Sequence, residues 1–161
     1  MNPLTNEFLE SLLTTCKQDN RVPCVDLLIK NDLGEIIVQK RADNRRLFPG
    51  CWEVPGGHVE EGESFEATIK REIKEELDMD FVELISFVDS FDWETIEKKY
   101  RNFQFLGIAT GTPKLTEPEK TTELKWINDT NLEVLLENRQ EEDNHHYIVV
   151  KKALELIKAK E

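Results

Sequence analysis

The segment GGHVEEGESFEATIKREIKEELDM, residues 56–79, decides how the rest of the chain is interpreted. Its apolar positions recur at helical spacing, at Ile69, Ile73 and Leu77. Its last three glutamates are spaced i, i+3 and i+4 and share one helical face, at Glu72, Glu75 and Glu76. At about 100° per residue, these carboxylates lie within an arc of roughly 100°. The segment predicts a helix that buries one stripe and holds three carboxylates on the next.

Three carboxylates held this close raise one another's pKa unless a positive charge lies between them. A divalent cation supplies that charge, and a ligand set made only of oxygen favours Mg²⁺, Mn²⁺ or Ca²⁺ over zinc or copper. Arg71 offers a second positive charge, which neutralises part of the cluster or holds one carboxylate in place. The helix face is therefore a candidate metal site.

The spacing of these residues resembles the Nudix box, Gly-x5-Glu-x7-Arg-Glu-U-x-Glu-Glu-x-Gly-U, in which U is a bulky apolar residue. Gly57 is followed after five residues by Glu63, and after seven more by the run Arg71-Glu72-Ile73-Lys74-Glu75-Glu76. Ile73 and Met79 fill the apolar positions. Asp78 stands where the pattern has Gly, so we expect an altered or slightly strained end to the helix and intact chemistry.

The resemblance implies Mg²⁺ (or Mn²⁺) held by glutamate ligands. Glu72 and Glu76 would be the main ligands, Glu75 would assist, and the backbone carbonyl of Gly56 resembles a further ligand of the family. The attacking water needs a base, which is one of these glutamates or one on a loop. Glu72 is the first choice for the base, and Glu75 is the second catalytic candidate. The alternative is a solvated acidic helix face.

Two further residues of the pattern are expected to support the site. Glu63 would hold the metal-binding residues in position, bind a second metal or cap the helix. Arg71 would orient a glutamate of the motif through a bidentate ion pair. Gly57 permits a close backbone approach, and we expect it beside the substrate.

Residues 39–43 and 52–57 resemble the MutT-like branch of the family. In that branch an arginine after the second strand contacts the nucleotide, and Arg41 matches its place; the alternative is a solvated loop residue. The family often adds a loop glutamate as ligand or base, and we choose Glu119 over Glu117 and Glu123, with loop solvation as the alternative. The candidates for contact with the nucleobase of the substrate are also candidates for core packing: Trp93, Phe103, Phe105, Asn144 and His145.

The chain's 161 residues suit one domain with its own core, and its net charge is −12. That charge argues against a nucleic-acid duplex or an anionic membrane as partner, but not against a small phosphate ligand that binds with a metal. No apolar run is long enough to span a membrane, and no signal peptide is evident, which favours a cytoplasmic protein. Three cysteines without a Cys-x-x-Cys pair make a disulfide framework or a zinc site improbable.

The order of elements predicts an α/β protein. We expect helices at residues 3–17, 65–77, 131–138 and 141–158, and strands at 21–30, 35–40, 52–54, 81–89, 100–110 and 124–127. Residues 90–99 are expected to form a polar loop that carries Trp93, and Asp26 to face water or a cleft. The arrangement is similar to the Nudix fold, a mixed β-sheet sandwiched between α-helices. We divide the chain into an N-terminal helical extension, 1–20, and a Nudix hydrolase domain, 21–161.

The resemblance implies metal-dependent hydrolysis of a phosphoanhydride bond in a nucleoside diphosphate linked to another moiety. The MutT-like residues favour a (d)NTP or an oxidised (d)NTP that gives a nucleoside monophosphate and pyrophosphate. ADP-ribose and dinucleotide polyphosphates remain open as substrates, and the family allows a homodimer. Two other classes are a non-catalytic nucleotide-sensing module and an enzyme like isopentenyl-diphosphate isomerase. The complete carboxylate set argues against both, and Cys51 is a poor match to the isomerase's catalytic cysteine.

Overall fold

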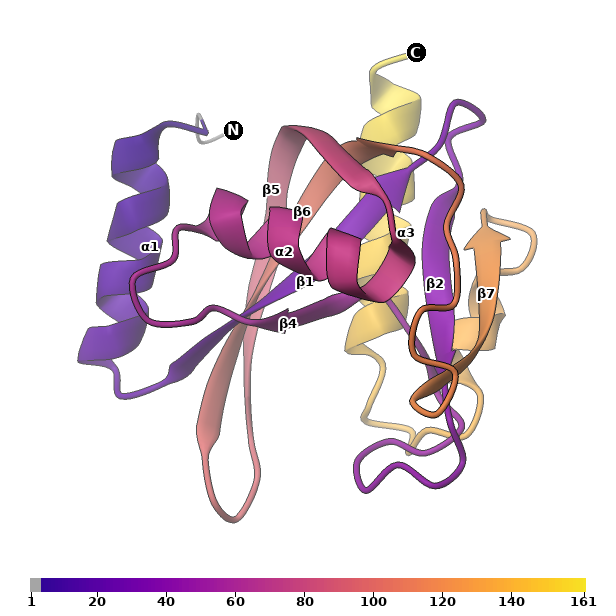
Figure 1. Cartoon of the computed structure of the whole chain (residues 1–161), viewed down its shortest axis with the longest axis horizontal. Coiled ribbons are helices and arrows are strands. Elements are labelled where there is room, and N and C mark those ends of the chain that lie inside the picture. The colour runs from indigo at the N-terminus through magenta and orange to yellow at the C-terminus, as the bar shows by residue number, and fades with distance from the viewer. Residues whose placement is uncertain (1–3) are drawn as a thin grey trace.

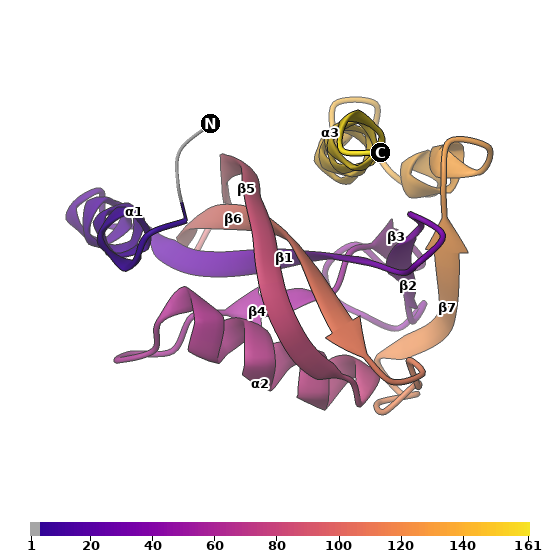
Figure 2. The same ribbon diagram turned by 90° about the horizontal axis from the view of Figure 1, so that it is seen from above.

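A mixed seven-stranded sheet forms the centre of the molecule, with helices on both faces (Figures 1 and 2). The structure is a computed structural model that describes residues 4–161. Its helices are α1 (Asn6–Gln18), α2 (Phe65–Leu77), α3 (His145–Ala159) and a 3-10 turn at Leu132–Leu136. Its strands are β1 (Val22–Lys30), β2 (Ile36–Arg41), β3 (Trp52–Glu53), β4 (Gly56–His58), β5 (Asp80–Glu94), β6 (Lys99–Thr110) and β7 (Thr121–Ile127). The expected α/β architecture, with a helix added at the N-terminus, is confirmed.

Strand β1 organises the sheet, whose order is β3-β2-β1-β6-β5, with β4 also paired to β1 and β7 to β2. It runs parallel to β6 over its whole length, from Val22 opposite Tyr100 to Lys30 opposite Ile108. Its neighbours β2 and β4 are antiparallel to it. Because side chains alternate between the faces of a strand, β1 supplies two separate cores.

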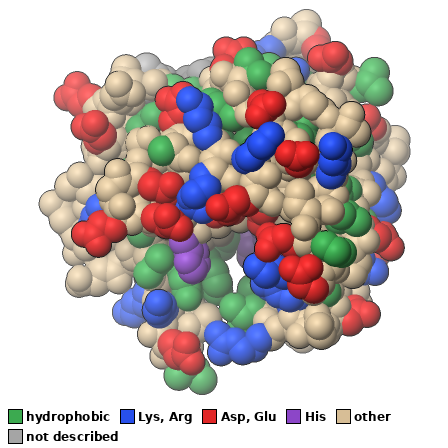
Figure 3. Space-filling view, viewed as in Figure 1, with side chains coloured by type: hydrophobic (Ala, Val, Ile, Leu, Met, Phe, Trp, Pro, Cys, Tyr) green, Lys and Arg blue, Asp and Glu red, His purple; other side chains and the backbone are tan. Residues whose placement is uncertain are grey.

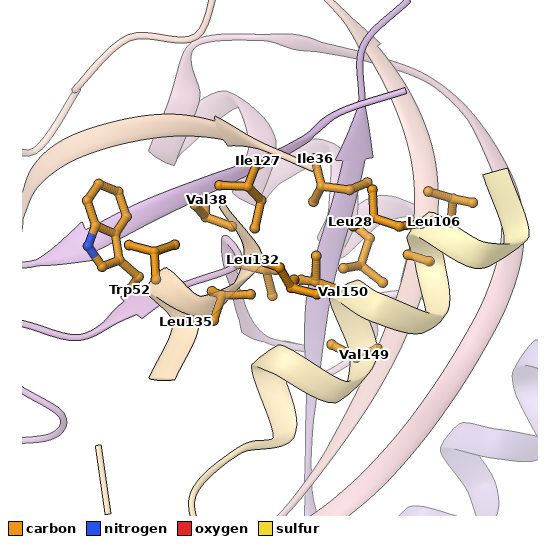
Figure 4. Packing of buried hydrophobic residues seen from close by; sticks show 14 of the residues in the cluster. Leu28, Ile36, Val38, Trp52, Leu106, Ile127, Leu132, Leu135, Val149 and Val150 are labelled. Atoms are coloured by element: carbon orange, nitrogen blue, oxygen red, sulfur yellow. The ribbon is translucent and has the colours of Figure 1, made fainter. Parts of the chain in front are cut away.

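Two apolar clusters hold the helices on the sheet. On one face, α1 and α2 pack with Val25, Leu27 and Ile29 of β1. On the other face, Leu28 joins side chains of β2, β6, α3 and the 3-10 turn, and Figure 4 shows Val150 and Leu132 among them. Helix α2, which carries the box glutamates, is therefore fixed to the sheet along its length by a buried stripe. Among residues 4–161, no helix is long and apolar enough to cross a bilayer.

The expected polar loop at residues 90–99 is wrong. Strand β5 continues to Glu94 and β6 begins at Lys99, so that the loop shrinks to residues 95–98. The hydroxyl of Thr95 closes the turn by accepting from the backbone N–H groups of Glu97 and Lys98, at 3.2 and 3.1 Å. The segment is polar because it is a hairpin that projects beyond the body of the molecule into solvent (Figure 1).

Several element boundaries also differ from expectation. The last helix begins at His145 and not at residue 141, because residues 140–143 form a turn in which the Asp143 carboxylate binds Arg139 at 2.8 Å. Residues 131–138 contain a 3-10 turn in place of an α-helix. Gly56–His58, expected only as a turn, pairs with β1 as strand β4. The expected start of the first helix at Pro3 lies outside the described residues.

Candidate active site

Helix α2 begins and ends as its sequence indicates. The Ser64 side chain caps its N-terminus by accepting from the Ala67 N–H at 3.1 Å. Its buried stripe includes Ile69, Ile73 and Leu77. At the C-terminus, Asp78 adopts the left-handed conformation, with φ 53° and ψ 40°, that a glycine takes most easily. Asp78 thus keeps the backbone conformation of the cap, and the Glu76 backbone stays helical.

Arg71 binds several carboxylates at once. Its guanidinium donates to both oxygens of Glu63, at 2.9 and 2.8 Å, and to Glu72 at 2.7 Å. It also reaches Glu75 at 3.4 Å and the His58 carbonyl at 2.9 Å. The hydrogen bonds from Arg71 lower the pKa of Glu63 to about 2. Arg71 and Glu63 therefore join the loop before α2 to the helix face that carries the glutamates.

Glu72 lies directly against the backbone of Gly57. A Cβ atom added to Gly57 would lie 2.2 Å from Oε1 of Glu72, so only glycine leaves room for this carboxylate. Glu72 is buried, and burial raises its pKa in spite of the ion pair with Arg71. The paired glycines thus provide the close approach that the sequence predicts, although the group that approaches is a box glutamate.

Glu76 is held by strand β4, because its Oε2 accepts from the Gly56 N–H at 2.9 Å. Burial raises its pKa well above the ordinary range, and the negative charges of Glu72 and Glu53 raise it further. A Cβ atom on Gly56 would lie 2.0 Å from the carbonyl oxygen of Val25. Glu76 is therefore a half-buried carboxylate with two like charges nearby.

This donor set fits a hard divalent cation. Glu72 is buried and Glu76 is half-buried, and the charge on Glu72 helps to raise the pKa of Glu76. A cation between the two carboxylates would relieve this repulsion. Arg71 partly neutralises Glu72, whereas Glu76 accepts from a neutral donor, the Gly56 N–H. As they stand, no three acidic, histidine or cysteine side chains among residues 4–161 converge on one point.

Arg41 lies at the end of β2 as expected, but it is paired and not solvated. Its Nη1 donates to Glu53 at 3.2 Å and its Nε to the Leu47 carbonyl at 2.8 Å. Glu53 was not anticipated as part of the site, yet its charge contributes to the raised pKa of Glu76. The signal was available: a lone glutamate in a short apolar strand directly before the Pro-Gly-Gly turn.

Asp26 neither faces water nor lies open to a cleft, which corrects the expectation. It is buried, with the Asn102 amide nitrogen at 3.1 and 3.2 Å from its two oxygens and that of Gln104 at 3.2 Å. Burial raises its pKa to about 7, and these bonds oppose the rise. Asn102 in turn accepts from the Trp93 indole N–H at 2.8 Å. The partners are 76 and 78 residues away along the chain, so sequence pattern gave no sign of them.

The other candidates divide between core and surface. Phe103 and Phe105 are core residues, whereas Trp93 stacks on Tyr100 with 4.4 Å between ring centroids, and His145 lies 4.0 Å from the Phe91 ring. Asn144 is exposed before α3. Glu119 is exposed, and within residues 4–161 no hydrogen bond or ion pair links it to a box glutamate.

The remaining loop glutamates also lie apart from the box. Glu117 pairs with Lys120 at 2.8 Å, and Glu123 lies opposite Lys40 in the sheet. On the face that carries α2, Figure 3 shows a hollow near the centre, rimmed by acidic, basic and histidine side chains. Arg71 therefore links Glu63, Glu72 and Glu75 directly. Within residues 4–161, no hydrogen bond or ion pair joins Glu117, Glu119 or Glu123 to these side chains.

Comparison with known proteins agrees with this geometry. Residues 20–150 match the NUDIX domain family model. Nucleoside triphosphatase NudI of Escherichia fergusonii is 30% identical over 118 residues, which cover 65% of this chain and 80% of that protein. A match of 42% identity to an uncharacterised Nudix hydrolase of Nostoc is shorter and covers 34% of that protein's length.

Solved structures extend the likeness to most of the fold. A MutT NUDIX hydrolase from Burkholderia pseudomallei superposes with a TM-score of 0.66 at 25% identity, covering 82% of this chain and 97% of that one. A MutT structure from a study of Aliivibrio salmonicida and Vibrio cholerae gives 0.64 at 30% identity, covering 84% and 98%. The family match, the box and the sheet with its helices agree, and the chain belongs to the Nudix hydrolase family, in its MutT-like branch.

Proposed function

We propose that the protein hydrolyses a phosphoanhydride bond in a (d)NTP or an oxidised (d)NTP, giving a nucleoside monophosphate and pyrophosphate. The observation that carries this proposal is the pair Glu72 and Glu76. One carboxylate is buried and the other half-buried on the same helix, and the pKa of each is raised. The names of the relatives, MutT and nucleoside triphosphatase NudI, support a triphosphate over ADP-ribose or a dinucleotide polyphosphate.

The residues that would hold Mg²⁺ or Mn²⁺ are Glu72, Glu75 and Glu76, with the carbonyl of Gly56 and the loop residue Glu119. When bound, the ion offsets negative charge on phosphate oxygens and lowers the pKa of a water molecule. The first three residues share one helix face, so a single rigid element sets their spacing. Glu119 would approach from the loop before β7.

The remaining roles follow from the contacts of the side chains. Arg71 fixes one oxygen of Glu72 at 2.7 Å, and Glu63 fixes Arg71 from the other side. Glu72 is the proposed general base, and Glu75, which is more exposed, is the second candidate. Arg41 would contact the nucleotide, and its guanidinium is held by Glu53 of β3 at 3.2 Å. Gly57 would lie beside the substrate. A homodimer and a cytoplasmic location remain predictions.

The test is a screen of (d)NTPs, oxidised (d)NTPs, ADP-ribose and dinucleotide polyphosphates with Mg²⁺ or Mn²⁺, read by phosphate and pyrophosphate release. For the best substrate, Glu76→Gln should lower kcat at least about 100-fold, because losing a metal ligand costs more than losing a residue that hydrogen-bonds to a ligand. Glu66→Gln is the matched control, since Glu66 is exposed on the same helix and its one ion pair within residues 4–161 is with Lys70 at 3.8 Å.

Two outcomes would contradict the proposal. Full activity of the Glu76 variant would remove the ligand assignment. Tight nucleotide binding without turnover of any substrate would instead indicate the sensing module. The isomerase alternative has little support, because Cys51 is buried, its thiol contacts the Asn138 carbonyl at 3.4 Å, and burial raises its pKa, all of which oppose a reactive thiolate.

A further inference from the structure

The loop of residues 111–120 closes the C-terminal end of α2. The last four carbonyls of a helix have no partner within it. The cap residue Asp78 takes one of them, donating its N–H to the Lys74 carbonyl at 3.1 Å. The Lys114 N–H takes another, at 2.9 Å from the Leu77 carbonyl. The carbonyls left over belong to Glu75 and Glu76, two of the proposed metal ligands.

Thr116 supplies the missing donor for both. Its hydroxyl contacts the carbonyl oxygens of Glu75 and Glu76, the latter at 3.1 Å. A hydroxyl carries a single proton, so one O–H is shared between two neighbouring carbonyls. No valine or alanine at this position can replace it. One loop side chain therefore hydrogen-bonds to the backbone of both glutamates at the end of the box.

The same loop is fixed at its other end to strand β2. The N–H groups of Lys120 and Thr121 donate to the Glu117 carbonyl, at 2.9 and 3.0 Å, which makes a tight turn. The Lys120 carbonyl then accepts from the Ala42 N–H at 2.8 Å. Glu119 lies inside this turn. It is therefore carried on a short segment between two anchors, the end of α2 and the end of β2.

We propose that Thr116 is a positioning residue that docks this loop on α2 and so places Glu119 with respect to Glu75 and Glu76 for metal binding. The inference rests on the proposed function. It assigns Thr116 no contact with substrate or metal. Asp78 assists the docking from its place in the cap, because its carboxylate lies 3.5 Å from the Lys114 ammonium. Asp78, which stands where the family pattern has glycine, thus contacts the loop of residues 111–120.

The test measures Mn²⁺ binding by electron paramagnetic resonance, without substrate. Thr116→Val should raise the Mn²⁺ Kd about tenfold, the lower end of the cost of losing a residue that hydrogen-bonds to a metal ligand. Thr116→Ser keeps the hydroxyl and should restore the Kd to within about twofold of the native value. Thr112→Val is the matched control, because Thr112 is exposed in the same loop and makes no hydrogen bond to the rest of residues 4–161. Amide exchange of residues 111–121 should accelerate in Thr116→Val alone.

A double-mutant cycle then decides whether Thr116 acts through Glu119. Glu119→Gln should weaken Mn²⁺ binding in the native background and have little further effect in Thr116→Val. Effects that multiply, or a Thr116→Val protein with native Mn²⁺ affinity, would overturn the inference. If Thr116→Ser failed to restore affinity, a purely steric role would replace it. A native protein that neither binds Mn²⁺ nor releases phosphate would instead refute the proposed function, while the amide exchange would still report the docking.

Discussion

At the scale of single residues, the two glycines at the start of the box meet very different neighbours. A Cβ on Gly57 would collide with the carboxylate of Glu72, the far end of a flexible side chain, at 2.2 Å. A Cβ on Gly56 would collide with the backbone oxygen of Val25, which cannot move without opening the pairing of β4 with β1. The two adjacent glycines therefore have different roles: Gly57 leaves space for the Glu72 carboxylate, and Gly56 allows β4 to pair closely with β1.

Substituting each glycine by alanine should distinguish an effect on catalysis from an effect on stability. Gly57→Ala should fold, with a melting temperature within a few degrees of native, and lose about 100-fold in kcat because Glu72 is displaced. Gly56→Ala should unfold at a much lower temperature or fail to accumulate, since backbone atoms must shift. Circular dichroism melts and phosphate release measure the two effects. Native kcat in Gly57→Ala would show that the position of Glu72 does not matter to the reaction.

At the scale of elements, Glu63 joins the loop before α2 to the helix through Arg71. The pKa of Glu63 is about 2 in the folded protein, below its ordinary value of about 4.3 in an unfolded chain. The depressed pKa means that the ion pair stabilises the fold fully above about pH 4.3, and that this stabilisation is lost as the pH falls towards 2.

Glu63→Gln should therefore reduce the free energy of unfolding by about 2 kcal/mol at pH 7, the range for hydrogen bonds to charged groups. The difference from the native protein should shrink steadily below about pH 4. Urea unfolding at several pH values with EDTA present measures it, and Glu61→Gln, at an exposed position of the same loop, is the control. A difference that stays constant down to pH 2.5 would mean that the ion pair is not its source.

The elements also show how far sequence reasoning reaches. The bounds of α2 were predictable because cap, apolar spacing and box all lie within one continuous segment. Strands were expected at 81–89 and 100–110, but the extension of β5 to Glu94 was not, since a strand that projects into solvent carries the polar composition of a loop. In the site, Arg71 and Glu63 were found by motif spacing. The burial of Asp26 and the role of Glu53 depend on contacts between distant strands, which a single sequence does not reveal.

At the scale of the whole molecule, α1 shares a core with α2 although it lies at the edge of the fold (Figure 2). Cys16 is fully buried, and Phe8 contacts Phe87 edge-to-face with 5.9 Å between ring centroids. Arg101 adds an ion pair to Asp19 at 2.9 Å. The family match begins at residue 20, after this helix. The helix is thus outside the matched domain in sequence and part of its core in space.

A chain that lacks residues 1–20 should consequently be less stable by about 3 kcal/mol or more, since two or three apolar side chains lose their burial. Its kcat/KM at low temperature should stay within about threefold of native, because the hydrogen bonds that Glu72, Glu76 and Arg71 make within residues 4–161 go to residues outside α1. Phe8→Ala is the milder variant, and should lose part of that stability without loss of activity. If the shortened chain remained folded by circular dichroism yet lost activity, α1 would belong to the functional unit and the division at residue 20 would be wrong.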